Sequence, residues 1–452
     1  MGLKIHSMAR LRTLRRYPAL RTHAAKKYEA IRESLCECLL IIACQISASW
    51  QSYNGRAPFY RTKYAEIFFV FPGIAFSPAS IVYAQESKCV LPANIERSIS
   101  LDSGCNFSGG LTIKKSDVKL DCRGATIDAR TVPVGIAVRG YAIRNVEIVN
   151  CRVFGARRTG IHIQAPLSDY DMNQLPMEER YEASARSISI INTTVMSSGV
   201  DGIYVGSYAM GTKIRGVSVE QSGSVGIYLE QSSVETSISG SQISRNGFGD
   251  PLGREKRRPF REGVAIDSSA RNTIEGNRID GNAAGGIFLY KNCWERSNNP
   301  RQVQRWQHSS YNEIRNNTFT DEPVGVWIAS RQTMNMKNWE CGDTPIAPGY
   351  YRDFADHNRV VANTFNSGRI GINIEDDYNH VLQNIFYEMT DSCVVVGSPL
   401  RDHLYGIGIR GTSLVGNSCN GIAGYTVQGL SKVDSCKGNK WNDIPYSCTL
   451  NK

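Results

Sequence analysis

The stretch Gly263-Val264-Ala265-Ile266-Asp267 decides the fold, because its pattern of a glycine followed by alternating apolar residues recurs along the chain. Apolar residues occupy the second and fourth places, which is the period of a strand with one face buried. The third and fifth places therefore face outward, where functional side chains are expected. The other copies of this pattern are Gly135–Arg139, Gly160–Gln164, Gly202–Gly206, Gly226–Glu230, Gly286–Tyr290, Gly325–Ala329 and Gly371–Glu375.

The shorter spacings between these glycines, such as Gly202 to Gly226, are about 24 residues, and the longer ones fit the same repeat plus an insertion. A repeat of this size with several short strands predicts a parallel β-solenoid, in which each coil stacks on the next. Two columns of asparagine confirm the register: Asn272, Asn312, Asn358 and Asn379, and five residues later Asn277, Asn317, Asn363 and Asn384, with Thr236 and Ser241 in the same places one coil earlier.

Stacked asparagines can hydrogen-bond to one another at interior turns, so these columns predict structural ladders rather than a ligand site. The apolar columns are equally regular and predict a continuous core. They are Ile238, Ile274, Ile314, Val360 and Val381, and Ile243, Ile279, Phe319, Phe365 and Phe386.

Together with an opening coil at 111–127, these columns resemble the right-handed parallel β-helix repeat proteins of the pectin-lyase-like superfamily, over roughly residues 95–420. The resemblance implies an all-β, single-stranded right-handed parallel β-helix with capped ends and loop insertions on one face. The predicted divisions are a leader at 1–84, an N-terminal cap at 85–107, the β-helix at 108–420 and a C-terminal cap at 421–452. The superfamily implies several functions, namely polysaccharide lyases, glycoside hydrolases, uronate epimerases, phage tailspikes and periplasmic accessory proteins.

The front of the chain predicts export. A signal peptide is expected at about 61–84, with an apolar run at 67–76, small residues before a cut after Ala84, and too few apolar residues to span a membrane. The sixty residues before it fit no export signal. They indicate a start codon placed too early, with a weak lipoprotein box ending at Cys44 as the alternative. The expected location is extracytoplasmic, either periplasmic or secreted.

The excess of basic residues lies in this front segment. The chain has 52 Lys and Arg against 42 Asp and Glu, but residues 1–84 hold 12 against 4 of these, which leaves 40 against 38 in the rest. A nearly neutral body gives no support to nucleic-acid binding. No membrane span is predicted, and the oligomeric state is left open.

The ten cysteines beyond residue 84 form an even set without metal-binding spacing, which predicts disulfides in an oxidising compartment. Buried free thiols in a cytosolic protein are the alternative. The expected relations are Cys89 and Cys105 in the first cap, Cys122 with Cys151 and Cys393 with Cys419 between neighbouring coils, Cys293 with Cys341 between two loops, and Cys436 and Cys448 in the last cap.

The outward columns hold aromatic residues beside carboxylates. Aromatic faces stack on sugar rings, and carboxylates bind hydroxyls or act in acid–base catalysis. Long excursions at 166–185, 292–309 and 332–356 are expected to wall this face. The alternative is that the loops cover the aromatics as a second core. The predicted substrate-binding residues are His162, Tyr204, Tyr228, Phe288, Tyr290, Trp327, Arg331 and Glu375.

Glu230 and Asp267 occupy the fifth place on adjacent coils, so their carboxyl groups are expected about 5 Å apart. That separation suits a retaining glycosidase pair, and the proximity of two like charges would raise one pKa. The alternatives are a cation site or a salt bridge to the basic segment 254–261. Ala265 leaves a small gap beside the pair where a sugar ring could enter.

A polysaccharide lyase or uronate epimerase would use other residues, with Lys291 as the catalytic group and Arg331, Tyr290 and His308 nearby. The cluster Glu375, Asp376 and Asp377 could bind a divalent cation, form a second subsite or be a solvated turn, and no cofactor is otherwise predicted.

The sequence therefore predicts an exported carbohydrate-active enzyme that binds a polysaccharide or oligosaccharide. Hydrolysis by Glu230 and Asp267 is the first hypothesis and lyase or epimerase chemistry the second. A non-catalytic periplasmic or surface protein that binds or scaffolds a glycan is the third.

Overall fold

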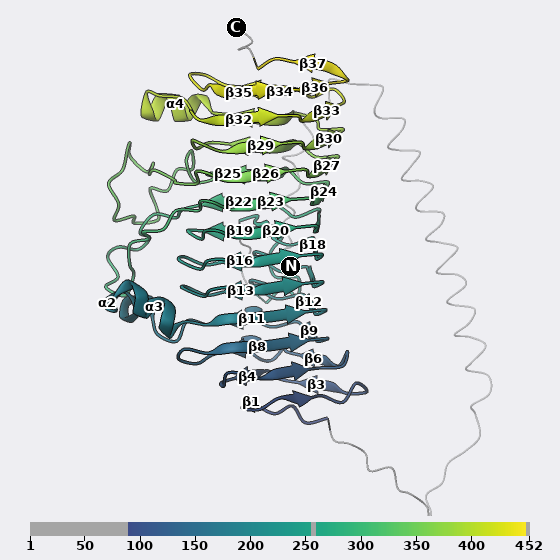
Figure 1. Ribbon diagram of the computed structural model, residues 1–452. Coiled ribbons are helices and arrows are strands. Elements are labelled where there is room, and N and C mark those ends of the chain that lie inside the picture. Colours follow the sequence, from purple (N-terminus) through teal and green to yellow (C-terminus); the bar gives the residue numbers. More distant parts are fainter. Residues whose placement is uncertain (1–88, 255–258, 449–452) are drawn as a thin grey trace, which may run out of the picture. The chain divides into compact units, whose positions relative to one another are not determined.

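The computed structural model describes residues 89–254 and 259–448. The predicted leader and signal peptide lie outside these residues. Three long parallel sheets run along a stack of coils, and each complete coil contributes one strand to each sheet (Figure 1). Every strand pairs in parallel with its counterpart in the neighbouring coils, apart from a final antiparallel pair. This is the all-β parallel β-helix that the repeat predicts.

Sheet A carries the glycine pattern and the outward columns. Its strands in order are β1 (Asn94–Ile95), β4 (Leu111–Ile113), β7 (Val134–Val138), β10 (Thr159–Ile163), β13 (Ile203–Val205), β16 (Ile227–Leu229), β19 (Glu262–Asp267), β22 (Gly285–Tyr290), β25 (Val324–Ile328), β28 (Ile370–Ile374), β31 (Ser392–Val396) and β34 (Tyr425–Val427).

Sheet B follows sheet A in each coil. It is formed by β2 (Ile99–Ser100), β5 (Lys119–Asp121), β8 (Arg144–Val149), β11 (Arg186–Ile191), β14 (Lys213–Arg215), β17 (Ser237–Ser239), β20 (Thr273–Glu275), β23 (Glu313–Arg315), β26 (Arg359–Val361), β29 (His380–Leu382), β32 (Thr412–Val415) and β35 (Val433–Lys437).

Sheet C completes each coil. It is formed by β3 (Asn106–Ser108), β6 (Thr126–Asp128), β9 (Arg152–Phe154), β12 (Thr194–Met196), β15 (Ser218–Glu220), β18 (Gln242–Ser244), β21 (Arg278–Asp280), β24 (Thr318–Thr320), β27 (Thr364–Asn366), β30 (Ile385–Tyr387), β33 (Ser418–Asn420), β36 (Asn439–Trp441) and β37 (Ile444–Tyr446).

The predicted core columns are confirmed. The column from Ile238 to Val381 lies in sheet B and the column from Ile243 to Phe386 in sheet C, each in register from coil to coil and buried. In the second column Phe319, Phe365 and Phe386 stack with ring centroids 4.6 and 4.8 Å apart. Apolar side chains at one place in every coil therefore build a single core along the whole stack.

The asparagine ladders are also confirmed. Asn317 shows the pattern: its side-chain oxygen accepts from the backbone and the side-chain amide of Asn277, both at 2.9 Å, and its own amide donates to Asn363 at 3.0 Å. A third ladder, which the sequence analysis missed, links Asn246 to Asn282 and Asn282 to Glu322.

The third ladder explains the glycine at the first place of the repeat in two of the coils. A Cβ on Gly226 would lie 2.8 Å from the side-chain nitrogen of Asn246, and one on Gly263 would lie 2.7 Å from that of Asn282. The backbone and the ladder side chains approach too closely at this corner for any residue but glycine.

The segments predicted as caps take part in the coils. Within residues 89–107 the strands β1, β2 and β3 already pair with the next coil, because their backbone groups find the same parallel partners. At the other end β34, β35 and β36 continue the three sheets, and β37 closes the stack by an antiparallel pairing with β36. Coil stacking therefore extends further at both ends than the predicted boundaries of 107 and 421.

The predicted excursions all leave the stack beside sheet A. The first contains helices α2 (Asp169–Gln174) and α3 (Met177–Ala183), and α4 (Pro399–Tyr405) lies on the same side of the stack (Figure 1). The three expected pairings form, including Cys293–Cys341 between two loops. The four cysteines of the predicted caps pair as Cys89–Cys105 and Cys436–Cys448. Within the described ranges, no helix is long and apolar enough to cross a membrane.

Candidate functional site

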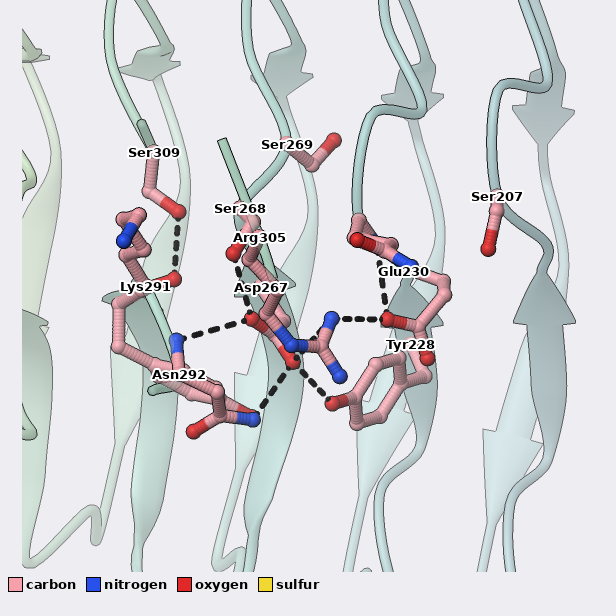
Figure 2. Close-up of polar contacts among 12 residues, drawn as sticks. Ser207, Tyr228, Glu230, Asp267, Ser268, Ser269, Lys291, Asn292, Arg305 and Ser309 are labelled. Carbon is pink, nitrogen blue, oxygen red and sulfur yellow. Dashed lines mark hydrogen bonds and ion pairs between the residues drawn. The ribbon is translucent and has the colours of Figure 1, made fainter. Parts of the chain in front are cut away.

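The acidic pair, Glu230 and Asp267, lies on adjacent strands of sheet A as predicted, with Leu229 paired to Ile266 just before it. A cation separates the two carboxylates. Nη1 of Arg305 lies 2.5 Å from Oε1 of Glu230 and 3.3 Å from Oδ2 of Asp267 (Figure 2). The predicted alternative of a salt bridge is therefore what the geometry shows, although the arginine comes from the 292–309 excursion and not from the segment 254–261.

Asp267 has no free face. It is fully buried and accepts hydrogen bonds from the Tyr228 hydroxyl at 2.6 Å, the Asn292 side-chain amide at 2.7 Å, the Ser268 hydroxyl at 3.0 Å and the Asn292 backbone at 3.3 Å (Figure 2). Together with Arg305, these donors occupy both carboxylate oxygens. A carboxyl group that is buried and saturated with donors in this way is fixed in place and does not reach a substrate.

Glu230 is held in a similar way. One oxygen accepts from the Gln231 backbone at 2.8 Å and from Arg305, and the other accepts from the Tyr204 hydroxyl. Burial acts to raise the pKa of Glu230, but Arg305 brings it below its ordinary value. Burial raises the pKa of Asp267, with Arg305 opposing the rise and Glu230 adding to it. The pKa values of the two carboxyls are thus shifted in opposite directions, as those of a catalytic acid and base would be. Both groups nevertheless lie buried around Arg305.

Much of the predicted aromatic face is a second core. Ala265, Phe288 and Tyr290 are buried together with Val225 and Val324, and Trp327 packs against them. The expectation that Phe288 and Tyr290 line an open groove is wrong, because these side chains pack with their neighbours along sheet A. The gap expected at Ala265 is filled for the same reason.

The residues expected for lyase chemistry do not gather in one open groove. The Arg331 guanidinium lies 4.0 Å from the centre of the Tyr290 ring and donates to Asn292 at 3.1 Å, in a largely buried position. The Lys291 ammonium lies 5.6 Å from the Phe354 ring and points away from the acidic pair (Figure 2). His308 stacks on that same Phe354 ring at 4.3 Å.

The acidic cluster at 375–377 is neutralised by arginines. Asp377 pairs with Arg401 at 2.9 Å, and Asp376 lies 3.6 Å from the same guanidinium. Burial raises the pKa of Glu375 to about 7, although Thr333 donates a hydrogen bond to it at 2.9 Å. In the part of the chain that the structure describes, no group of three or more His, Cys, Asp or Glu could hold a metal ion.

An open groove lies on sheet A nearer the N-terminal end of the stack. Two adjoining hollows of about 710 and about 390 Å³ share Arg139, Gln164, Pro166 and Leu167 in their walls, so they form one sheet A groove. The larger hollow also contains Lys114 and Tyr141, and the smaller contains His162, Asp169, Tyr204 and Ser207. His162 and Tyr204 both come from the predicted third-place column. The centroids of their rings lie 4.8 Å apart.

The charges of this groove are not balanced. Arg139 and Lys114 are exposed and have no ion-pair partner within residues 89–254 and 259–448. Burial lowers the pKa of His162 to about 4, with Arg158 lowering it further and Glu230 opposing, so the imidazole is neutral at neutral pH. Burial also raises the pKa of Asp169, which accepts a hydrogen bond from Ser207 at 3.0 Å.

The sequence analysis placed Arg139 and Gln164 in the fifth-place column and His162 in the third, and these residues do meet in the groove. It missed Lys114, Tyr141 and Asp169. Lys114 follows β4, in the same outward column one coil earlier, so extending the column by one coil would have found it. Asp169 and Leu167 reach the groove from an excursion, for which the repeat gives no signal.

Comparisons with known proteins agree with the fold. A family model described as "Right handed beta helix region" matches residues 180–304, and one described as "Periplasmic copper-binding protein (NosD)" matches residues 254–443. No curated protein matches the sequence. Each family model covers less than half of the chain.

Three solved structures illustrate the likeness. A double mutant of the periplasmic alginate epimerase AlgG is 12% identical with a TM-score of 0.50, over 80% of this chain and 79% of that one. An alginate lyase from Paenibacillus sp. str. FPU-7 is 12% identical with a TM-score of 0.39, over 74% and 99%. The catalytic domain of a GH87 α-1,3-glucanase in complex with nigerose is 12% identical with a TM-score of 0.43, over 78% and 64%. At these identities the likeness shows the fold alone.

The copper binding named for the second family model can be tested on the donors present. All ten cysteines within the described residues are in disulfides, and no group of three or more His, Cys, Asp or Glu that could hold a metal ion occurs there. Copper sites need imidazole, thiolate or thioether ligands gathered around one point. The His, Cys, Asp and Glu side chains among the described residues do not fit such a site.

Proposed function

We propose that this chain, a right-handed parallel β-helix protein of the pectin-lyase-like superfamily, binds an anionic polysaccharide in the sheet A groove and removes a proton from it. The observation that carries the proposal is the groove itself: two cations without partners, Arg139 and Lys114, stand near a neutral imidazole, His162. The solved structures above include enzymes named for acting on alginate, which suits a uronate as the sugar.

The groove has the groups that such chemistry needs. A cation near the uronate carboxylate stabilises the charge that develops when the proton on the adjacent carbon is removed. The neutral His162 imidazole can accept that proton. In β-elimination the electron pair of the broken C–H bond forms a carbon–carbon double bond, the bond to the glycosidic oxygen breaks, and that oxygen takes a proton from protonated His162 or from water. In epimerisation water on the opposite face donates a proton to the same carbon, and no bond of the chain breaks.

Hydrolysis by the acidic pair is the second candidate, and the different pKa directions of Glu230 and Asp267 favour it. It has less support, because Arg305 lies between the carboxylates and Asp267 is saturated with donors. Water activation needs a carboxylate that is open to the sugar. The five disulfides suit a protein that works in an oxidising, extracytoplasmic compartment.

Product analysis tests the proposal. The full chain is incubated with polyuronates and with neutral glucans, and three signals are measured: the ultraviolet absorbance of unsaturated uronides, solvent deuterium incorporated next to the carboxylate, and new reducing ends. Either of the first two signals supports proton abstraction. Reducing ends without either signal would overturn it in favour of hydrolysis, and binding without any signal would leave a non-catalytic glycan-binding protein.

Single substitutions test whether the product signals arise from the sheet A groove. Arg139→Ala and His162→Ala are expected to lower kcat/KM at least tenfold, because each removes a group that meets the substrate. Arg278→Ala is the matched control, since Arg278 is an exposed arginine on sheet C. Equal losses in all three variants would show that the groove is not the site.

A further inference from the structure

Residues 305–310, here called the strap, form an extended segment with two different faces. Arg305, Gln307 and Ser309 point toward sheet A: Arg305 bridges the acidic pair, and the other two donate to backbone carbonyls beneath. Trp306 and His308 alternate with them and point outward, and 44% of Trp306 is exposed. The strap is therefore fixed from its inner face, which holds the Trp306 indole on the outer surface.

A column of turn residues borders the strap. Arg271, Tyr311, His357 and Tyr378 each precede an asparagine of the first ladder, and each has a positive φ between 54° and 58°. The rings of Tyr311 and His357 stack 5.1 Å apart, and those of His357 and Tyr378 stack 5.2 Å apart. Tyr311 is the last aromatic ring of this stack, and 62% of it is exposed.

A hollow of about 450 Å³, here called the outer pocket, lies between the strap and this column. Its walls include the exposed rings of Trp306 and Tyr311, the guanidinium of Arg271 and the carboxylate of Asp356. Asp356 accepts a hydrogen bond from Ser310, which fixes its orientation. The volume lies within the range of roughly 300–1,000 Å³ that is typical of small-molecule sites.

The chemistry of these walls matches a sugar ring. Half-exposed aromatic faces such as those of Trp306 and Tyr311 bury apolar C–H groups favourably. A guanidinium and a carboxylate together provide planar donors and acceptors for neighbouring hydroxyls. Arg271 lies 3.4 Å from Glu235 and Asp356 lies 3.3 Å from His357, so the walls of the pocket carry charges of both signs.

We propose that the outer pocket is a second saccharide-binding site, which holds one pyranose unit of a glycan by stacking on Trp306 and Tyr311. The assignment rests on the proposed function only in taking a glycan as the ligand. Recognition of the ring face and its hydroxyls does not require a uronate carboxylate. The site lies on the opposite face of the strap from the acidic pair, so a chain held there would be anchored beside sheet A.

The test separates this site from the sheet A groove. In the variant Arg139→Ala/His162→Ala the groove is disabled, and binding of short uronate and neutral glucan oligosaccharides is then measured by calorimetry and saturation-transfer NMR. We expect binding to remain in this variant. Adding Trp306→Ala or Tyr311→Ala is expected to weaken it at least tenfold. Trp441→Ala is the control, because 40% of Trp441 is exposed and it lies at the C-terminal end of the stack.

The two proposals fail in different ways. If the groove-disabled variant binds none of these saccharides, or if Trp306→Ala binds as tightly as Trp441→Ala, the outer pocket is not a saccharide site, whatever the products show. If the polysaccharide products are those of hydrolysis while Trp306→Ala still weakens binding, the groove chemistry is overturned and the outer pocket stands.

Discussion

Glu322 ends the third ladder, and replacing it by glutamine is expected to stabilise the protein at alkaline pH. One carboxyl oxygen of Glu322 accepts from the Asn282 backbone at 3.2 Å and from its side-chain amide at 2.7 Å. The other oxygen is buried and has no hydrogen-bond partner among the described residues. Burial raises the pKa of Glu322 from 4.5 to about 8, against the two Asn282 hydrogen bonds and with help from Asp280 and Asp321.

The direction in which stability changes with pH follows from proton linkage. The folded protein keeps the Glu322 proton up to about pH 8, whereas the unfolded chain loses it near pH 4.5. The stability that this protonated carboxyl contributes is therefore fully present below pH 4.5 and is lost as the pH rises through about 8. At about 1.36 kcal/mol per pH unit, the interval from 4.5 to 8 corresponds to a ceiling of about 5 kcal/mol.

Glu322→Gln keeps the side-chain oxygen that accepts the hydrogen bonds of Asn282. Because the glutamine amide cannot ionise, the variant does not lose stability as the pH rises through this range. We expect equal stabilities, or a small cost in the variant, at about pH 5, and a gain of at least about 2 kcal/mol at about pH 9. Urea unfolding with intact disulfides, followed by one probe at several pH values, measures the difference. Glu96→Gln is the matched control, because Glu96 is exposed. A difference between Glu322→Gln and the natural chain that does not grow with pH would refute the reasoning.

Three further predictions concern the ladders, the loops and the groove. Asn317→Ala leaves partners on both neighbouring coils without hydrogen bonds and is expected to lower the free energy of unfolding by at least about 3 kcal/mol in urea unfolding. Removing the Cys293–Cys341 disulfide, with a sequence separation of 48, is expected to cost about 4 kcal/mol in the same assay. If His162 is the base, the pH profile of kcat/KM should show no loss from its protonation until about pH 4, whereas an ordinary histidine would titrate near 6.5.

The sequence predicted the parts of the molecule that repeat. Ile238 and Asn317 could be placed from their spacing alone, because residues of the same type recur at one position in several consecutive coils and stacking converts that position into a column. The third ladder was missed because its members differ in type. Glu322 stands where Asn282 stands one coil earlier, so the column is not visible as a run of one residue.

The candidate site depends on segments that do not repeat. Glu230 and Asp267 were correctly placed on adjacent coils, but their partner Arg305 comes from an excursion whose return path no periodicity fixes. Tyr290 and Phe288 pack with their neighbours along sheet A, which turns an expected groove into a second core. His162, Tyr204, Arg139 and Gln164 from the predicted columns line the open groove, where sheet A is less covered.

The strap joins the acidic pair to the outer pocket, so one substitution is expected to affect both. Arg305→Met would leave Glu230 and Asp267 buried without a cation, which is expected to cost about 3–5 kcal/mol of stability. Because Trp306 is the next residue, loss of that anchor should also let the indole move and weaken saccharide binding in the outer pocket. Trp306→Ala should weaken binding while leaving the urea midpoint unchanged, since its side chain is half exposed. If Arg305→Met lowered stability but bound saccharide as the natural chain does, the inner face of the strap would not be what positions Trp306.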